Sequence, residues 1–532
     1  MTLKQYLFRC RKQNLHVLVW ITLGSICLTV WGLSVANALT ALVNLEIKQF
    51  IFWIVMMGGI FLLWVLQVFM EARQTSVAVQ AMNIEMRKDI SQIISQYNYE
   101  QFHQKEEGTY VSWLVNDIAT INEYGFRNLS MIISQCLNII FSSIALLGFH
   151  YSLNISVFIL AIFMIIIPRT FKRKMDHQLL KVTNANEKIT TNFSDIINGF
   201  DTVFPMNLTR YIVDKTNEQS KNLAKEKVKF STIAGAMSAT TNGTSLISQI
   251  LIIVLAGVLY FMGLVPIGAV SAAQYFSATI FTSLTGLSAN LIELQTTKPI
   301  FNKFTETPLI NNKDKINVLP LNELIELTNV TYKYPASETP IIENMSMKIK
   351  KGKKYAIVGE SGKGKTTLLK LIMGYLSDYE GNIKFDNINY EKINFESIRD
   401  QIIYINQKPH IFNVTIEENI TLGQDYSKDE INCVIEELEL SQWIESLPDG
   451  LQTKIKYNGS NLSGGQSQKI ALARGLITGK QIILFDEGTS SLDKKAASSI
   501  EQLLISSTLT VLMITHHLDP AIASQLEEVY RI

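Results

Sequence analysis

The sequence has few cysteines, few prolines and almost no net charge. Its 532 residues include 4 cysteines and 11 prolines, and its formal net charge is +1. The cysteines, Cys10, Cys27, Cys136 and Cys433, lie too far apart for the short spacings of a zinc site or a disulfide framework. The near-zero charge gives no electrostatic indication of nucleic acid, and no nucleic-acid partner is expected. The composition therefore argues against a disulfide-stapled secreted domain and against a nucleic-acid-binding protein.

Charged residues are also missing from the middle of the long apolar runs. These runs predict six membrane spans, at about residues 15–36, 50–70, 131–149, 155–167, 238–262 and 267–291. The fourth run is short, and the sixth is rich in Ser and Thr, which suits a helix that lines a wet cavity. A carrier coupled to protons or ions usually needs an ionisable residue within the membrane. We therefore expect this protein to draw its energy from another source.

Basic residues near the spans indicate how the chain crosses the membrane. The first run follows Lys4 and Arg9 and closes with small residues, as in a signal peptide, but its length and the spans that follow favour an uncleaved helix. Most other lysines and arginines of this half lie in two long connections, around Arg87 and around Arg173. The positive-inside rule places these connections and both termini in the cytoplasm of a multi-pass cell-membrane protein. The connections are polar and poor in proline, so we expect the membrane helices to continue into the cytoplasm.

The part of the chain after about Asn322 contains a phosphate-binding loop. A short apolar strand, Tyr355–Val358, runs into Gly359-x-x-x-x-Gly364-Lys365-Thr366 and then into a helix, which is the context of a Walker A motif. In such a loop backbone N–H groups cradle the phosphates of ATP, the lysine reaches the β- and γ-phosphates and the threonine hydroxyl binds Mg²⁺. The predicted ATP-binding residues of this loop are Gly359, Glu360, Ser361, Gly362, Lys363, Gly364, Lys365, Thr366 and Thr367.

Two further strands end in residues that suit phosphate chemistry. The strand in "QIILFDE" ends in Asp486, which is placed to bind magnesium, and Glu487, which is placed to orient or deprotonate an attacking water. The strand Thr510–Ile514 is followed by His516, at the sheet edge where parallel-sheet proteins bind ligands. His516 is a candidate partner of the γ-phosphate, although on its own it is equally compatible with a surface histidine.

A second glycine-rich segment, "NLSGGQSQKIALARG" from Asn461 to Gly475, also predicts a loop that turns into a helix. Free backbone N–H groups and the positive helix end favour an anion at such a place. The P-loop can bind the phosphates of one nucleotide without help. The second anion-favouring segment therefore indicates a second binding event. The residues by themselves leave open what that event is.

The order of these motifs resembles the nucleotide-binding cassette of ABC transporters. The resemblance implies that Tyr334 stacks on adenine, that Gln407 contacts magnesium and the attacking water, that Asp493 belongs to the D-loop and that His516 is the switch histidine. It also implies that two cassettes close head to tail, so that the signature loop of one chain caps ATP bound to the P-loop of the other. The signature residues are Leu462, Ser463, Gly464, Gly465 and Gln466. The expected partner is a second copy of this chain or a related half-transporter.

The resemblance extends over nearly the whole chain and implies its domain organisation. We expect an α-helical six-span transmembrane domain over residues 1–300, a linker over 301–322 and an α/β P-loop nucleotide-binding domain, the ABC cassette, over 323–532. Phe102–Ile121 resembles the first cytoplasmic coupling region of exporters, and Phe193–Val203 resembles the second. The lipid bilayer and a transported cargo are the other expected partners.

The predicted function is ATP-driven export by alternating access, with ATP and Mg²⁺ as cofactors and a peptide or other amphipathic compound as cargo. A lipid or drug exporter and an importer built on an exporter-like scaffold remain alternatives. An ATP-gated regulator or channel is disfavoured, because Glu487 and the signature residues are all present. The motifs permit a homodimer without requiring one.

Overall fold

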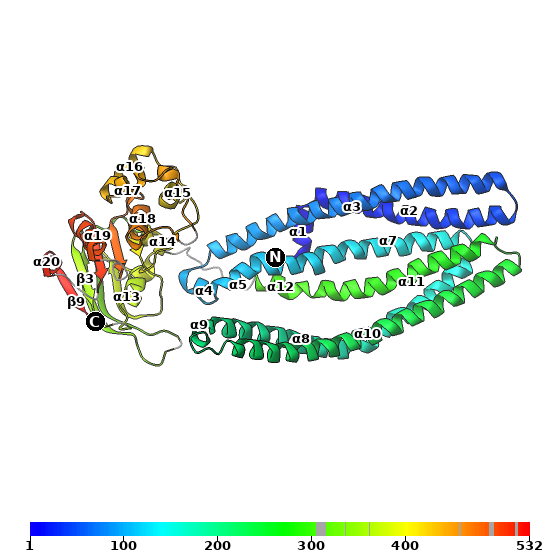
Figure 1. Ribbon diagram of the computed structural model, residues 1–532, viewed down its shortest axis with the longest axis horizontal. Coiled ribbons are helices and arrows are strands. Elements are labelled where there is room, and N and C mark those ends of the chain that lie inside the picture. The colour runs from blue at the N-terminus through cyan, green and yellow to red at the C-terminus, as the bar shows by residue number, and fades with distance from the viewer. Residues whose placement is uncertain (305–314, 336, 361, 457–458, 489–493, 516–519) are drawn as a thin grey trace. The chain divides into compact units, whose positions relative to one another are not determined.

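The computed structural model describes the chain except for residues 305–314, 336, 361, 457–458, 489–493 and 516–519. Its contacts divide the chain into two compact units. The helical unit comprises Met1–Gln96 and Lys105–Thr307, and the α/β unit comprises Tyr97–Gln104 and Pro308–Ile532. Figure 1 shows long helices in the first and strands flanked by helices in the second. A short piece of chain between two long helices therefore belongs to the α/β unit.

The helical unit consists of long helices joined by short turns. Its helices are α1 (Leu3–Arg9), α2 (Arg11–Val43), α3 (Ile47–Ser95), α5 (Glu107–Ser112), α6 (Ile118–Ile121), α7 (Asn128–Leu147), α8 (Tyr151–Asn198), α9 (Phe200–Val203), α10 (Arg210–Phe261), α11 (Gly268–Gln295) and α12 (Thr297–Lys303). Two π-helical segments, Trp113–Asp117 and Asn122–Arg127, connect α5, α6 and α7 into one continuous helical stretch. Such wide turns are uncommon and occur mostly as local insertions in α-helices.

Five helical segments of the described chain are long and apolar enough to cross a membrane. They are Arg11–Val43, Ile47–Ser95, Glu107–Leu147, Tyr151–Asn186 and Arg210–Phe261. The sixth predicted span lies in α11, a less apolar helix that packs against α2, α7 and α10 and buries Ala272, Phe276 and Phe281. A six-span topology therefore remains a prediction, while the helical nature of all six segments is confirmed.

The long helices exceed what a bilayer needs. Helices α3, α8 and α10 have 49, 48 and 52 residues, whereas about 20 residues span the hydrocarbon core. These lengths agree with the predicted continuation of the membrane helices into the cytoplasm, which stays a prediction. Their polar ends carry the chain well past the apolar zone.

Helix α1 is held against α3 and α12 by a buried tyrosine. The Tyr6 hydroxyl donates to Asp89 Oδ2 at 2.9 Å, and Arg9 Nη1 donates to the same oxygen at 2.7 Å. The Tyr6 ring is fully buried and lies 6.3 Å from the Phe301 ring, centroid to centroid. Because both the hydroxyl and the ring of Tyr6 make contacts, α1 is part of the packed unit.

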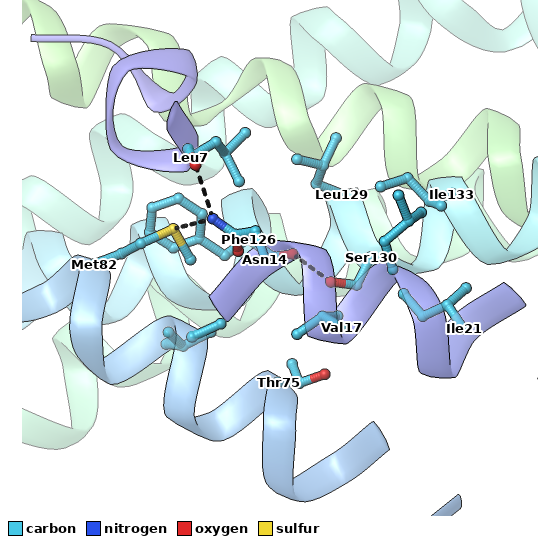
Figure 2. A pocket seen from close by; sticks show the side chains of 13 residues that line it. Leu7, Asn14, Val17, Ile21, Thr75, Met82, Phe126, Leu129, Ser130 and Ile133 are labelled. Carbon is cyan, nitrogen blue, oxygen red and sulfur yellow. Dashed lines mark hydrogen bonds between the residues drawn. The ribbon is translucent and has the colours of Figure 1, made fainter. Parts of the chain in front are cut away.

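The start of α2 lies over a small cavity of about 60 Å³ between α1, α2, α3 and α7. Figure 2 shows Asn14 at its rim, where the side-chain amide donates to the Leu7 carbonyl at 3.0 Å and approaches the Met82 sulfur at 3.7 Å. Apolar side chains such as Val17 and Ile21 form most of the rest of the lining, together with Thr75 and Ser130. The Asn14 side chain therefore links α1 to α2 and α3.

The α/β unit contains two sheets and a group of shorter helices. Its strands are β1 (Leu324–Tyr332), β2 (Ile342–Lys350), β3 (Lys354–Val358), β4 (Glu380–Phe385), β5 (Ile388–Asn389), β6 (Ile402–Ile405), β7 (Ile482–Asp486), β8 (Thr510–Ile514) and β9 (Glu528–Arg531). Its helices are α4 (Tyr99–His103), α13 (Lys365–Ile372), α14 (Phe395–Arg399), α15 (Ile416–Thr421), α16 (Lys428–Glu437), α17 (Ser441–Glu445), α18 (Gly464–Leu476), α19 (Lys494–Ser506) and α20 (Pro520–Ala523).

The larger sheet brings the predicted motifs together. Its strand order is β6-β7-β8-β3-β9, and all its pairs are parallel. Strands β7 and β8 are buried along their whole length, which explains their continuous apolar sequences. Parallel strands end at a common edge, so the segments that follow β3, β6, β7 and β8 meet there. The smaller sheet, in the order β2-β1-β4-β5, is antiparallel.

Candidate nucleotide site

The P-loop connects β3 to α13 through two glycines with left-handed backbone. Gly362 has φ +83° and Gly364 has φ +88°, a region that disfavours residues with a Cβ. A Cβ on Gly364 would also lie 2.6 Å from the Ile341 carbonyl oxygen. The loop therefore needs glycine at residue 364 both for its backbone angle and for its closeness to the neighbouring segment. It ends at the N-terminus of α13, whose free N–H groups favour phosphate.

Lys365 lies folded back across the P-loop. Its ammonium donates to the carbonyls of Gly359 at 2.9 Å and Glu360 at 3.0 Å, and it lies 3.4 Å from Glu487 Oε1. Only 3% of the side chain is exposed, against 20% for Glu487. A buried ammonium held by carbonyls and one carboxylate is placed to exchange these partners for phosphate oxygens.

Asp486 is a buried carboxylate held from two sides. Its Oδ1 accepts a hydrogen bond from the Thr366 hydroxyl at 3.0 Å, and its Oδ2 accepts one from the Tyr404 hydroxyl at 3.0 Å. Burial raises the pKa of Asp486, and the two hydrogen bonds oppose that rise. A carboxylate and a hydroxyl side by side are oxygen ligands of the kind that Mg²⁺ prefers, with phosphates and water completing its shell. Among the residues described, no cluster of three or more His, Cys, Asp or Glu side chains could hold a metal by itself.

Glu487 follows β7 with an unusual backbone. Its φ is +50°, so it leaves the strand in the left-handed region that non-glycine residues rarely adopt. Its N–H donates to the Ile514 carbonyl at 3.2 Å, which ties the turn to the end of β8. The left-handed turn brings the carboxylate near Lys365, and backbone outliers of this kind cluster at functional sites.

Tyr334 lies beside the P-loop helix. Its hydroxyl is 3.1 Å from the Thr367 hydroxyl, and its ring meets Tyr332 edge-on at 5.1 Å. The residue is partly exposed. The hydroxyl end of the Tyr334 side chain is thus held next to the phosphate loop.

The glycine-rich segment forms the exposed start of α18. Ser463 is the N-cap: its hydroxyl accepts from the Gln466 N–H at 3.2 Å, while the Gln466 side chain accepts from the Ser463 N–H at 2.8 Å. This reciprocal capping box satisfies two donors and leaves the first N–H groups, those of Gly464 and Gly465, directed out of the helix end. The predicted second anion-favouring loop is therefore a capped helix N-terminus.

Two polar residues of α18 hold the segment that follows β6. Gln468 is 2% exposed and donates to the carbonyls of Asn406 at 3.3 Å and Gln407 at 3.1 Å. Arg474 donates to the carbonyls of His410 and Asn419, both at 2.6 Å, and burial lowers its pKa to about 10. Sequence analysis assigned no role to either side chain. Arg474 had a signal, since it follows the apolar run Ile470–Ala473, whereas Gln468 lies between Ser467 and Lys469 and had none.

A surface cavity of about 780 Å³ adjoins this segment. Tyr404, Asn406, His410, Phe412 and Arg474 contribute to its lining. The segment around Gln407 thus has the cavity on one side and the buried side chain of Gln468 on another. Contacts from α18 hold its backbone in place.

Comparisons with known proteins match both units. The "ABC transporter" family profile matches residues 342–490, and the "ABC transporter transmembrane region" profile matches residues 18–284, half of the chain. The chain belongs to the ABC transporter family. With a membrane unit and a cassette in one polypeptide, the transporter is a fused half-transporter whose cassette binds and hydrolyses ATP to drive transport.

The transporter is similar to several named proteins. An ATP-dependent lipid A-core flippase of Photorhabdus laumondii is 28% identical over 78% of this chain and 73% of its own length. An ATP-dependent permease, MDL1, of Candida albicans is 28% identical over 64% of this chain and 52% of its own. The solved structure of a bacterial Atm1-family ABC exporter with ATP bound superposes with a TM-score of 0.80 at 18% identity and covers 95% of this chain and 91% of that one. The predicted fold class, a helical membrane domain with an α/β cassette, is confirmed.

The structure places most of the predicted site residues of the transporter. Thr366 contacts Asp486, Lys365 contacts Glu487, and Tyr334 contacts Thr367. Three predicted residues, Ser361, Asp493 and His516, lie outside the described part of the chain. The predicted linker, 301–322, begins within α12. It includes residues 305–314, which also lie outside the described part of the chain.

The prediction for the first coupling region began too late in the chain. The piece that packs with the cassette is Tyr97–Gln104, whereas the prediction was Phe102–Ile121. From Lys105 onward the chain belongs to the helical unit, where Trp113–Asp117 and Asn122–Arg127 form the π-helical segments. The docked piece is short and mixes aromatic with polar residues, so its own residue pattern did not indicate which unit it joins.

Proposed function

We propose that this transporter exports a peptide or other amphipathic cargo across the cell membrane, as a dimer, by alternating access. The observation that carries the proposal is the grouping of the P-loop with Asp486 and Glu487 at one edge of the parallel sheet, in a chain that also supplies the membrane helices. The positive-inside pattern of the sequence supports cytoplasmic termini and a cytoplasmic cassette.

The side chains at the sheet edge divide the work of hydrolysis. Lys365 exchanges Glu487 and the loop carbonyls for the phosphate oxygens of ATP, because those oxygens carry more negative charge. Glu487, released from the lysine, then orients the attacking water and accepts its proton. Thr366 and Asp486 would hold Mg²⁺, with Gln407 as a further ligand. A bound magnesium ion neutralises charge that develops on the phosphates.

The predicted residues outside the described chain complete this assignment. His516 contacts the γ-phosphate, and Asp493 belongs to the D-loop that faces the partner. Tyr334 stacks on adenine, next to the P-loop residues 359–367. These roles rest on the resemblance to the family and on the positions of their described neighbours.

Each copy contributes one P-loop and one signature loop, and we assign them to different nucleotides. The exposed first turn of α18, with Leu462, Ser463, Gly464, Gly465 and Gln466, caps ATP that is bound to the P-loop of the other copy. The capping box supports this role because it stabilises the helix end without using the N–H groups of its glycines. The partner is a second copy of this chain or a related half-transporter.

A cross-linking experiment tests this composite site. Two differently tagged copies, each with its four native cysteines replaced by alanine, carry Lys363→Cys in one and Ser463→Cys in the other. We expect ATP and mild oxidation to join the two tags covalently, because closure brings the P-loop of one copy to the signature loop of the other. Copies that share the same single cysteine serve as the control. A mixed product that forms equally without ATP, or no mixed product at all, would show that the two loops do not face each other.

Transport into inside-out membrane vesicles tests the direction and the cargo. We expect ATP to drive a labelled amphipathic peptide into the vesicle lumen, with Glu487→Gln vesicles showing only leakage. A lipid cargo is the second candidate, and the relative named as a lipid A-core flippase supports it. ATP-driven movement of a labelled lipid without the peptide would favour that candidate, and ATP-driven loss of preloaded peptide would indicate an importer.

A further inference from the structure

Helix α4 is docked on the cassette although it lies in the chain between α3 and α5. Asn98 caps it through a capping box with Gln101. The Glu100 carboxylate accepts from the Ser377 N–H at 3.2 Å and from the Ser377 hydroxyl at 3.1 Å. The Tyr99 ring stacks on Tyr375 with centroids 4.4 Å apart and planes 12° apart. The piece of chain that connects two long helices is thus held by a carboxylate and by a stacked ring.

The stacked ring begins a series of contacts that leads to the predicted metal site. Tyr375 meets Tyr404 edge-on, with centroids 6.5 Å apart and planes at 78°. The Tyr404 hydroxyl then donates to Asp486 Oδ2 at 3.0 Å. Only two side chains, those of Tyr375 and Tyr404, separate the ring of Tyr99 from the carboxylate of Asp486.

The register of the sheet explains why Tyr404 reaches Asp486. Tyr404 on β6 is paired with Leu484 on β7, and paired residues project to the same face of a sheet. Asp486 lies two residues beyond Leu484, so it shares that face. Tyr404 therefore leans along the strand to the carboxylate at the end of the neighbouring strand.

The two hydrogen bonds to Asp486 come from different elements. Thr366 belongs to α13 and holds Oδ1, while Tyr404 belongs to β6 and holds Oδ2. Thr366 is itself a predicted ligand of magnesium, so its hydroxyl has another partner when the ion is bound. Tyr404 is then the donor that keeps the carboxylate in its orientation.

We propose that Tyr404 is a positioning residue for the metal-binding carboxylate of Asp486, and that Tyr375 links it to docked α4. Whether α4 is docked on Tyr375 thereby sets how tightly the cassette binds the metal ion of the metal–nucleotide complex. This inference rests on the proposed role of Asp486 as a magnesium ligand. It does not involve Gln407, which the family resemblance implies contacts magnesium and the attacking water.

The test measures how much a metal ion strengthens nucleotide binding. The full-length transporter in lipid nanodiscs binds the non-hydrolysable analogue AMP-PNP with Mn²⁺ and, separately, with EDTA. The dissociation constant in EDTA divided by the one with Mn²⁺ measures how much the metal strengthens binding. The electron paramagnetic resonance spectrum of Mn²⁺ reports the ligands around the ion. We expect Tyr404→Phe, which keeps the ring, to shrink this ratio about tenfold, as loss of one hydrogen bond to a charged group does. The dissociation constant in EDTA should stay within about twofold.

A matched control separates positioning from packing. The Tyr379 hydroxyl is buried and has no hydrogen-bond partner within the described chain. Tyr379→Phe removes the same atom from the same unit, and we expect it to leave the metal-dependent ratio unchanged. An equal loss in both variants would mean that Tyr404 acts only through the general stability of the cassette, and an unchanged ratio in Tyr404→Phe would overturn the proposal directly.

A double-mutant cycle tests the link to α4. Tyr99→Leu keeps the bonds of Glu100 and removes the stacked ring, and we expect it to shrink the ratio about threefold. In the Tyr404→Phe background, Tyr99→Leu should cause almost no further decrease of the ratio, because the hydrogen bond that connects Tyr404 to Asp486 is already missing. Effects that simply multiply would show that α4 and Tyr404 act independently.

The variant Asp486→Asn separates the two proposals, that Asp486 is a magnesium ligand and that Tyr404 positions it. A strong loss of the metal-dependent ratio in Asp486→Asn, together with no change in Tyr404→Phe, would overturn the positioning role and leave the magnesium ligand in place. An unchanged ratio in Asp486→Asn would remove the assigned metal ligand itself, and with it the reason to expect any effect of Tyr404.

Discussion

Glu487→Gln should bind ATP and almost fail to hydrolyse it. The amide has the shape of the carboxylate but cannot accept a proton, and loss of a general base lowers the rate by about 10²–10⁴-fold. The backbone at residue 487 is already left-handed, with φ +50°, and the substitution leaves it unchanged. The side chain therefore stays where it is and loses only its charge.

ATP affinity provides the second half of this prediction. In the structure Glu487 Oε1 lies 3.4 Å from the Lys365 ammonium and competes for it with any phosphate. Removing that negative charge should leave the affinity for ATP unchanged or increase it. The measurements are phosphate release by the purified transporter in lipid and binding of a fluorescent ATP analogue.

The matched control for this prediction is Glu445→Gln, an exposed glutamate of α17. It makes the same chemical change away from the sheet edge and should hydrolyse ATP at the wild-type rate. Wild-type turnover by Glu487→Gln would discard Glu487 as the base. Weak ATP binding by that variant would instead mean that the carboxylate stabilises the P-loop through Lys365.

Lys365→Met should weaken ATP binding far more than Lys363→Met. Both lysines belong to the P-loop, but Lys365 is 4% exposed and bonded across the loop, whereas Lys363 is exposed. A buried charge that meets phosphate makes hydrogen bonds of about 1.5–3 kcal/mol, so losing one corresponds to about 10–100-fold in affinity. An exposed ammonium is screened by water and ions, and its loss should change affinity by about fivefold at most.

Salt dependence distinguishes the two lysines further. The contribution of Lys363 should disappear at high ionic strength, where exposed charges are screened, while that of Lys365 should persist. Titrations of a fluorescent ATP analogue at low and high salt, on both variants and the wild type, measure this. Equal losses in the two variants would mean that the loop changes its conformation when ATP binds, so that the observed burial of Lys365 does not set its role.

Local patterns in the sequence were sufficient for the P-loop and for the strand that ends in Asp486 and Glu487. A strand, a glycine-rich turn and a helix follow each other within a few residues, so their geometry depends on neighbours in the chain. The same holds for the helical nature of the membrane segments, which depends on long apolar runs. The role of Lys365 could be predicted in this way, but its ion pair with Glu487 could not.

Contacts between distant segments were not predictable from the same patterns. The hydrogen bond of Tyr404 to Asp486 joins residues that are 82 positions apart, and that of Gln468 to the Gln407 carbonyl joins residues 61 apart. Each depends on strand order and on how α18 packs, which no local window contains. The first coupling region was misplaced for the same reason, because α4 is too short to carry a pattern that assigns it to the α/β unit.

The sequence by itself determined that this protein crosses a membrane with long helices and carries one ATP-binding cassette, because hydropathy and P-loop chemistry act over short stretches of chain. Tertiary structure decided which side chains hold the reacting groups: Lys365 against Glu487, Tyr404 against Asp486 and Tyr99 against Tyr375. The physical reason is that parallel strands bring remote segments to one edge of a sheet. Which residues meet there depends on strand order and register.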